Sequence, residues 1–203
     1  MKKLDSIRKK TIEALLIQHE TEHSHCKQVT KLALQIFDNT KGILHKYGDK
    51  ERELLEIGSL LHDIGYSISF DKHSKHSYNI IINSAMAGFD SNEITIIANI
   101  ARYHNGKPPK KSHENYNSIK DKKIKTIIKD LSAILRIADG LDRSHCDAVK
   151  NIKCLVDSFS GTCAFVITVP GGNCHTELYG VNKKKELFEK QFNVDIKFIV
   201  QNN

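Results

Sequence analysis

Histidine and aspartate stand in this sequence at helix positions where apolar residues are expected. His25 and His62 lie on the buried stripes of two helical patterns, and Asp139 lies on that of a third. A buried carboxylate destabilises a protein unless it is paired or binds a metal ion. Helices that turn His and Asp side chains toward one another are therefore typical of a metal site in a helical bundle. The candidate ligands are His25, His62, Asp63, His76, His104 and Asp139.

Each of these residues taken alone has a simpler interpretation. A lone histidine on an apolar helix face is more often a hydrogen-bonded core residue than a ligand, and Asp139 has Arg136 and Arg143 nearby as ion-pair partners. The six residues together favour a site for one or two divalent ions. Imidazole and carboxylate ligands suit Mn, Fe, Ni, Co or Zn, and they do not single out one of these ions or exclude Mg.

Helical periodicity positions these residues throughout the first 146 residues. Apolar residues recur at the spacing of one buried helix face over 29–37, near 51–64, from about 73 to 88, and over 121–143. Asp90 or Ser91 predicts the N-cap of a further helix that continues through Ala101. Residues 105–118, with one glycine and two prolines, predict a long loop.

After Cys146 the pattern changes to runs rich in β-branched residues. These predict strands over 152–159 and 163–169 joined by Ser160-Gly161, and a shorter strand near 175–179. A helix over 183–192 and a last strand over 194–200 complete the expected tail. The predicted fold is mainly α, with a helical bundle over residues 1–146 followed by a small α+β subdomain over 147–203.

Most of the positive charge lies in one segment. Residues 105–129 contain eight lysines against two acidic residues, Glu114 and Asp121, so this segment carries +6 of the net charge of +7. A basic patch of this kind attracts phosphate-rich ligands, although a solvated loop and outer helix face explain it equally well. With no arginine and only Tyr116 as an aromatic residue, the segment does not favour recognition of nucleic acid.

Composition excludes several classes of protein. The 203 residues are 39% apolar and 27% charged, which predicts a packed core rather than wholesale disorder. No apolar run approaches the ~20 residues that span a bilayer, and the basic start is typical of a helix rather than of a secretory signal. Five cysteines without a C-x-x-C pair argue against a disulfide framework or a zinc ribbon. We therefore expect no membrane partner and a cytoplasmic location.

The order His…His-Asp…Asp resembles the HD superfamily of metal-dependent phosphohydrolases. The similarity is closer to the C-terminal region of the exopolyphosphatase/guanosine-pentaphosphatase (Ppx/GppA) family, and it extends over nearly the whole chain. The segments that carry it are His25–Asp38, Leu60–Tyr66, His73–Ile81, Gly88-Phe89, Ala101–His104, Ile134–His145 and Lys185–Lys190.

This resemblance implies a dinuclear metal centre. It assigns a first ion to His25, His62, Asp63 and Asp139, and a second ion to His76, His104 and a bridging Asp63. Two ions about 3.5–4 Å apart can activate a shared water and hold the attacked phosphoryl oxygen. Asp63 and His62 would then act at the reacting centre. The candidates to bind phosphate oxygens are Arg102, Lys75 and Arg143, whose simpler role is pairing on helix surfaces.

Two functions of different class follow. The full-length relatives carry their phosphatase chemistry on an N-terminal actin-like half, which we do not find in this sequence, so exopolyphosphatase activity is not carried over. The retained ligand set predicts a metal-dependent phosphatase or phosphodiesterase acting on a nucleotide or another phosphorylated small molecule. The alternative is a non-catalytic regulatory module that binds polyphosphate or an alarmone-type nucleotide through its lysines. Nucleic acid ranks third as a partner, and a homodimer is left open.

Overall fold

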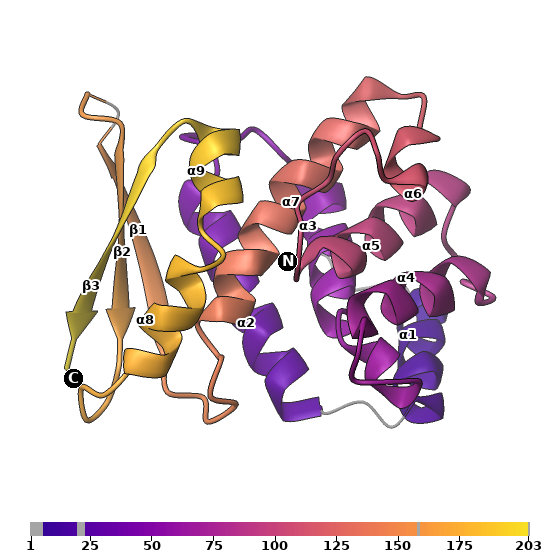
Figure 1. The fold of residues 1–203 in the computed structure, drawn as a ribbon, viewed down its shortest axis with the longest axis horizontal. Coiled ribbons are helices and arrows are strands. Elements are labelled where there is room, and N and C mark those ends of the chain that lie inside the picture. Colours follow the sequence, from indigo (N-terminus) through magenta and orange to yellow (C-terminus); the bar gives the residue numbers. More distant parts are fainter. Residues whose placement is uncertain (1–5, 20–22, 158, 203) are drawn as a thin grey trace.

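The computed structural model describes residues 6–19, 23–157 and 159–202. Its first part is helical, as predicted, and Figure 1 shows it on the right. The elements of this part are α1 (Ser6–Gln18), α2 (His23–Thr40), α3 (Asp49–Leu60), the 3₁₀ helix η1 (Ile64–Ser67), α4 (His73–Asn83), α5 (Ser91–Tyr103), α6 (Glu114–Asn117) and α7 (Lys122–Gly140).

A small α+β unit follows, which confirms the predicted fold class. Strands β1 (Asn151–Asp157) and β2 (Thr162–Thr168) form an antiparallel hairpin, and β3 (Asp195–Gln201) lies parallel to β2 at the other edge. Helices α8 (His175–Asn182) and α9 (Glu186–Phe192) form the crossover between β2 and β3. They lie between the sheet and α7 (Figure 1).

Three sequence predictions differ from the structure. The short strand expected near 175–179 is wrong, because this stretch is the first half of α8. The buried residues of α8 are Glu177, Gly180 and Val181, which is the spacing of one helix face packed on α7. The helix expected to end near 88 ends at Asn83, and the loop expected over 105–118 contains the short helix α6.

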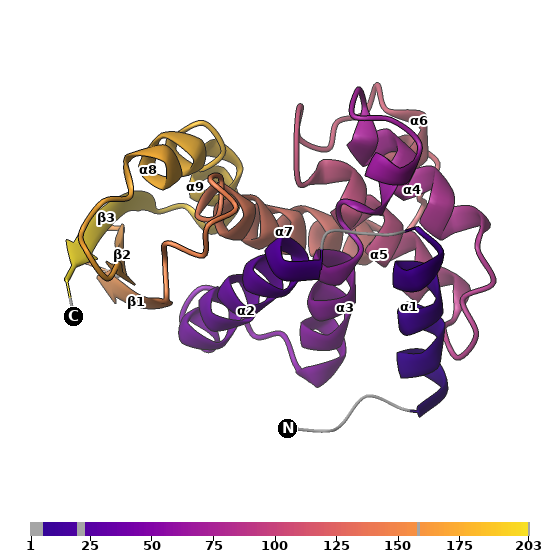
Figure 2. The ribbon, with the colours of Figure 1, turned by 90° about the horizontal axis from the view of Figure 1, so that it is seen from below.

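Helix α7 is the element that connects the two parts. Its apolar face is buried from Ile124 to the C-terminal end, and α2, α5, α8 and α9 all pack against it. Figure 2 shows α2 and α7 side by side, both extending from the helical part toward the sheet. One continuous hydrophobic core contains side chains of both parts. The subdomain boundary near Cys146 therefore stays a prediction.

Local capping fixes where α5 begins. The Asp90 carboxylate accepts hydrogen bonds from the backbone N–H groups of Asn92 and Glu93, and Glu93 accepts one from the Asp90 N–H. This reciprocal pair satisfies donors that a helix start leaves unpaired, and it confirms Asp90 as the N-cap. Among the described residues, no helix has the length and apolarity needed to cross a bilayer.

Candidate metal centre

The buried His and Asp side chains come from the ends of five helices. His25 lies in the first turn of α2 and His73 is the first residue of α4. The His62-Asp63 pair follows α3 directly, and His104 follows α5. Asp139 lies at the C-terminal end of α7. Helix ends leave backbone groups unpaired, so they can hold polar side chains at a place where five elements meet.

A close approach of α4 to the loop after α3 brings two of these ends together. The Ser77 hydroxyl donates to the carbonyl of His62 at 2.6 Å and accepts from the N–H of Gly65 at 3.0 Å. A side chain at Gly65 would collide with the backbone of α4 at His73 and Ser77. Glycine at this position therefore allows the first turn of α4 to face Asp63.

All four histidines are oriented by a hydrogen bond at Nδ1. Three of the acceptors are backbone carbonyls and the fourth is a buried carboxylate, so each Nδ1 carries a proton and each Nε2 faces the cluster, where the neutral form of the ring offers a lone pair. The four bonds are His25 to Asp142 Oδ2 at 2.7 Å, His62 to Ser59 O at 2.7 Å, His73 to Phe70 O at 3.1 Å and His104 to Ala101 O at 2.6 Å. This is the arrangement by which metal-binding imidazoles are fixed in proteins.

The four Nε2 atoms surround the Asp63 carboxylate. Its Oδ2 lies 3.3 Å from Nε2 of His62 and 3.7 Å from that of His25. Its Oδ1 lies 3.3 Å from Nε2 of His104 and 3.5 Å from that of His73. Asp63 is thus shared by two groups of potential ligands, His25 with His62 and His73 with His104. Within each group, the ligand atoms all lie within 4.8 Å of one another.

The donor set fits a divalent cation because its inward atoms are not satisfied otherwise. Within the described part of the chain, His62 Nε2 and Asp63 Oδ1 are buried without a hydrogen-bond partner. Nε2 of His73 and Nε2 of His104 lie 3.1 Å apart with both Nδ1 protons directed elsewhere. Two facing lone pairs repel unless a cation binds them, and two nitrogens bound to one ion at about 2.1 Å can lie about 3 Å apart.

Electrostatics keep the carboxylates ionised. Burial opposes ionisation of Asp63, but the His62 and His104 rings more than offset this effect and lower the pKa of the carboxyl. Burial lowers the pKa of His104 to about 3, and the neighbouring His62 charge adds to that shift. For His25, burial again lowers the pKa, but the contact with Asp139 and the hydrogen bond to Asp142 overcome this effect and raise the pKa to about 9. The central carboxylates are therefore ionised, and an ion that binds at Nε2 of His25 displaces a proton from that ring.

Asp139 divides its two oxygens between the cluster and a lysine. Its Oδ1 lies 3.6 Å from Nε2 of His25, and its Oδ2 forms a short ion pair with the ammonium of Lys184. Burial opposes ionisation here too, but the Lys184 charge and the contact with His25 lower the pKa of Asp139. Neither Arg136 nor Arg143 is its partner; the Arg136 guanidinium donates instead to the carbonyls of Tyr103 and Gly106.

The structure brings most of the predicted ligands to one place. Asp63, His62, His25 and His104 lie within the two groups, and Asp139 lies beside them. His76 belongs to neither group and is half-buried on α4. Its expected place is taken by His73, three residues earlier. The signal for this was Ser77 and Ile81, which share the buried face of α4 with His73 at a spacing of four.

The predicted phosphate-binding residues lie less close. Arg102 donates to the hydroxyl of Ser74 at 3.2 Å, beside His73. Lys75 and Arg143 are exposed, and neither is hydrogen-bonded to the cluster in the part of the chain that the structure describes. Sequence reasoning missed three further residues. Asp142 is fully buried and orients His25, the ring of His145 stacks on His25 with centroids 3.8 Å apart, and Lys184 pairs with Asp139.

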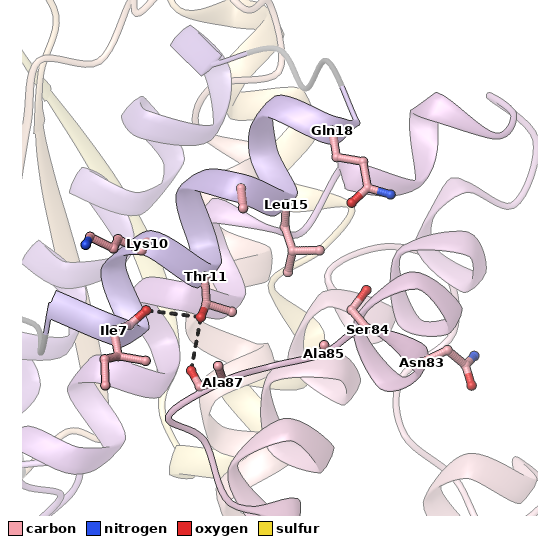
Figure 3. A pocket seen from close by; sticks show the side chains of 10 residues that line it. Ile7, Lys10, Thr11, Leu15, Gln18, Asn83, Ser84, Ala85 and Ala87 are labelled. Atoms are coloured by element: carbon pink, nitrogen blue, oxygen red, sulfur yellow. Dashed lines mark hydrogen bonds between the residues drawn. The ribbon is translucent and has the colours of Figure 1, made fainter.

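Two cavities lie away from the cluster. One, of about 660 Å³, lies between α1 and residues 83–87, where the Thr11 hydroxyl donates to the carbonyls of Ile7 and Ala87 (Figure 3). The other, of about 360 Å³, lies at the start of α7, and its lining includes Lys46, Lys122 and Lys123. Neither cavity is lined by a residue of the His/Asp cluster.

Comparisons with known proteins match the chain to one family. The family model described as Ppx/GppA phosphatase, domain III, matches residues 7–171. Proteins named guanosine-5'-triphosphate,3'-diphosphate pyrophosphatase, from Pseudoalteromonas translucida (strain TAC 125) and Vibrio vulnificus (strain YJ016), are each 28% identical over 98 residues. Each alignment covers 48% of this chain and only 20% of the relative. The chain thus matches about a fifth of these curated relatives.

Proposed function

Because the chain belongs to the Ppx/GppA phosphatase domain III family, we propose that it is a metal-dependent phosphohydrolase of the HD type. Its substrate is a nucleotide or another phosphorylated small molecule, hydrolysed as a phosphatase or a phosphodiesterase substrate. The observation that carries this proposal is the position of Asp63, whose two oxygens face two separate pairs of imidazoles. A structural histidine cluster has no need of a buried, shared carboxylate.

The residues of the cluster divide into two sets around Asp63. His25 and His62, with Asp139 beside them, would hold one ion, and His73 with His104 would hold a second. Ions bound there supply an activated water and positive charge against a phosphoryl group. Hydrogen bonds at Nδ1 hold the rings in place, so that little reorganisation is needed when the site is loaded. Arg102, held beside His73 by Ser74, is the nearest predicted residue for a phosphate oxygen.

The test combines metal analysis with a substrate screen. The purified protein is analysed for bound elements and then assayed on a panel of phosphomonoesters and phosphodiesters with Mn²⁺, Ni²⁺, Co²⁺ or Mg²⁺. We expect one or two ions per chain and turnover that chelator removes and the ion restores. Metal bound without turnover across the panel would favour the second candidate below. Absence of both metal and turnover would refute the hydrolase proposal.

The second candidate is a non-catalytic module that binds polyphosphate or an alarmone-type nucleotide. It is favoured by the cavity beside Lys46, Lys122 and Lys123. Lys122 begins α7 and Asp139 stands near its end, so at 1.5 Å per residue this cavity lies ~25 Å from the cluster. Ligand bound there acts independently of the metal centre. Binding of a short polyphosphate that persists after chelation, and that Lys122→Gln with Lys123→Gln abolishes, would support this candidate.

The cytoplasmic location and the low rank of nucleic acid as a partner stay predictions, and a homodimer is left open. Of the five cysteines, all of which are described, none is in a disulfide. The identity of the ion stays open, because imidazole and carboxylate ligands accept Mn, Fe, Ni, Co, Zn or Mg.

A further inference from the structure

Lys184 brings a positive charge from the C-terminal α+β unit into the candidate metal centre. It lies in the turn between α8 and α9, and its side chain is 12% exposed. Its ammonium pairs with Asp139 Oδ2, while Asp139 Oδ1 faces His25. The Lys184 charge is also close enough to contribute to the lowered pKa of His104, after burial and the charge of His62. The ammonium therefore stands at the edge of the cluster rather than on the outer surface.

The fold holds this turn in place by backbone contacts. Gly140 of α7 and Gly180 of α8 touch so closely that a Cβ at either position would approach backbone atoms of the other helix to 2.7 Å. The Arg136 guanidinium donates to the carbonyl of Lys184 at 3.4 Å and to that of Tyr103 at 3.1 Å. The turn is thereby tied to the end of α5, one residue before His104. Lys184 is positioned by the same helix that carries Asp139.

Lys184 and a metal ion compete for one carboxylate. Asp139 stands beside the group of His25 and His62, with Oδ1 3.6 Å from Nε2 of His25 and Oδ2 engaged by the lysine. An ion bound beside His25 needs this oxygen or its neighbour and repels the ammonium. Once displaced, the ammonium stays within a largely buried site, where a cation without an anionic partner is unfavourable. A phosphoryl oxygen of the substrate is the anion that such a site receives.

We propose that Lys184 is a substrate-binding residue that neutralises Asp139 before an ion binds and binds a phosphoryl oxygen afterwards. This inference rests on the proposed hydrolase function and adds to it that the C-terminal unit completes the site. A purely structural lysine would support both metal and phosphate binding. Lys184 opposes the first and supports the second.

The experiment compares Lys184→Met with Lys183→Met in the full chain. Lys183 is exposed and contacts the ring of Tyr179, so this control removes the same charge one residue away. Calorimetry measures Mn²⁺ or Co²⁺ binding to the metal-free protein, and then binding of inorganic phosphate to the loaded protein. For Lys184→Met we expect metal to bind at least about tenfold more tightly and phosphate at least about tenfold more weakly, because one unit charge is removed within a few ångströms of both. The control should match the wild type in both.

The outcomes distinguish failure of the Lys184 inference from failure of the hydrolase proposal. If the wild type and Lys184→Met bind metal equally well, the Lys184 inference is overturned and the hydrolase proposal stands. If both affinities fall together, the lysine is structural and the inference is again wrong. If neither protein binds metal, both proposals fail. Lys184→Arg keeps the charge but changes the shape, so its metal and phosphate affinities should lie closer to the wild-type values than those of Lys184→Met do, which separates loss of charge from loss of packing.

Discussion

The His/Asp cluster and the lysine-rich segment 105–129 are two charged regions of this protein that are built in opposite ways. The cluster is buried, its four imidazoles are fixed at Nδ1, and two of its inward atoms, His62 Nε2 and Asp63 Oδ1, have no hydrogen-bond partner among the described residues. The lysine-rich segment begins directly after His104, and Lys107, Lys110 and Lys111 are exposed. Part of its charge has a structural use, since the ammoniums of Lys125 and Lys129 lie 5.3 Å and 5.9 Å from the centre of the Tyr116 ring.

This difference shows why net charge is a poor guide to where chemistry occurs. Exposed lysines interact with a ligand through water and salt, which screen charges beyond about 10 Å at 0.1 M ionic strength. A buried carboxylate among oriented imidazoles acts at contact distance in a medium that screens little. We therefore expect substitutions in the cluster to abolish binding and substitutions in the lysine-rich segment to tune it.

The largest effect is expected from Asp63→Ala. It removes the carboxylate that, within the part of the chain the structure describes, belongs to both groups of imidazoles, and with it both charge and geometry. Metal content measured by elemental analysis should fall to background and phosphohydrolysis should be lost. Asp63→Asn, which preserves the shape, should fail in the same way, whereas Asp71→Ala on the exposed loop should behave as wild type. If Asp63→Ala retained its metal and its activity, the His/Asp cluster would not be the site of metal binding and hydrolysis.

A second pair of variants separates the structure from the sequence prediction. His73→Ala removes a ring whose Nε2 lies 3.5 Å from Asp63 Oδ1, and His76→Ala removes one that belongs to neither group. We expect the first to lose at least one ion per chain and about 100-fold in turnover, which is the upper range found even for residues that only support ligands. The turnover of His76→Ala should stay within about twofold of the wild-type value. Reversed results would show that α4 turns its other face to the site.

Asp142→Asn should have an intermediate effect, because Asp142 acts through His25. Its Oδ2 accepts the His25 Nδ1 proton at 2.7 Å, and the neutral amide is a weaker acceptor. Loss of such an orienting carboxylate typically costs 10–100-fold in metal affinity. The metal affinity of each variant is measured by a Co²⁺ titration followed by absorbance. Asp147→Asn is the matched control, since only the backbone N–H of Asp147 contacts Asp142. Equal affinities of the two variants would assign His25 a structural role.

The fold was predictable to the extent that its elements carry their own periodicity. The apolar stripe of α7 and the capping pair of Asp90 and Glu93 are local signals, and both predicted the helices where they occur. The stretch at 175–179 was assigned to the wrong element because its helical face is defined by a partner. Gly180 is buried where α8 rests on Gly140 and the side chain of Arg143. A sequence pattern cannot show which distant glycine lies opposite.

The candidate site was predictable where the residue lies on an apolar stripe, as His25 and Asp139 do. His76 follows from the family resemblance, whereas the spacing of Ser77 and Ile81 places His73 on the buried face of α4. Asp142 and Lys184 lie outside any helical stripe, and their roles depend on contacts across 117 and 45 residues. These contacts depend on how α2, α7 and the C-terminal unit pack against one another, and no local pattern in the sequence shows that packing.

The smallest effect is expected from the lysine-rich segment, and its dependence on salt distinguishes it from the cluster. Replacing Lys107, Lys110 and Lys111 by Gln removes three exposed charges and no contact to the cluster. Because exposed charges act on a polyanionic substrate at long range, KM should rise about three- to tenfold at low ionic strength and return toward the wild-type value near 0.5 M salt. Metal content and kcat should not change, since the ligand groups are untouched.

The matched control for this variant replaces Lys9, Lys153 and Lys197 by Gln. These lysines are exposed on α1, β1 and β3, so the net charge falls by the same three units without altering the lysine-rich segment. Steady-state kinetics across a salt series compares the two triple variants. If both raise KM equally, the total charge of the protein attracts the substrate and the position of the lysines is irrelevant. If replacing Lys107, Lys110 and Lys111 lowers activity equally at all salt concentrations, these lysines contact the substrate directly. The lysine-rich segment would then act at contact distance, as the His/Asp cluster does, and not through screened long-range attraction.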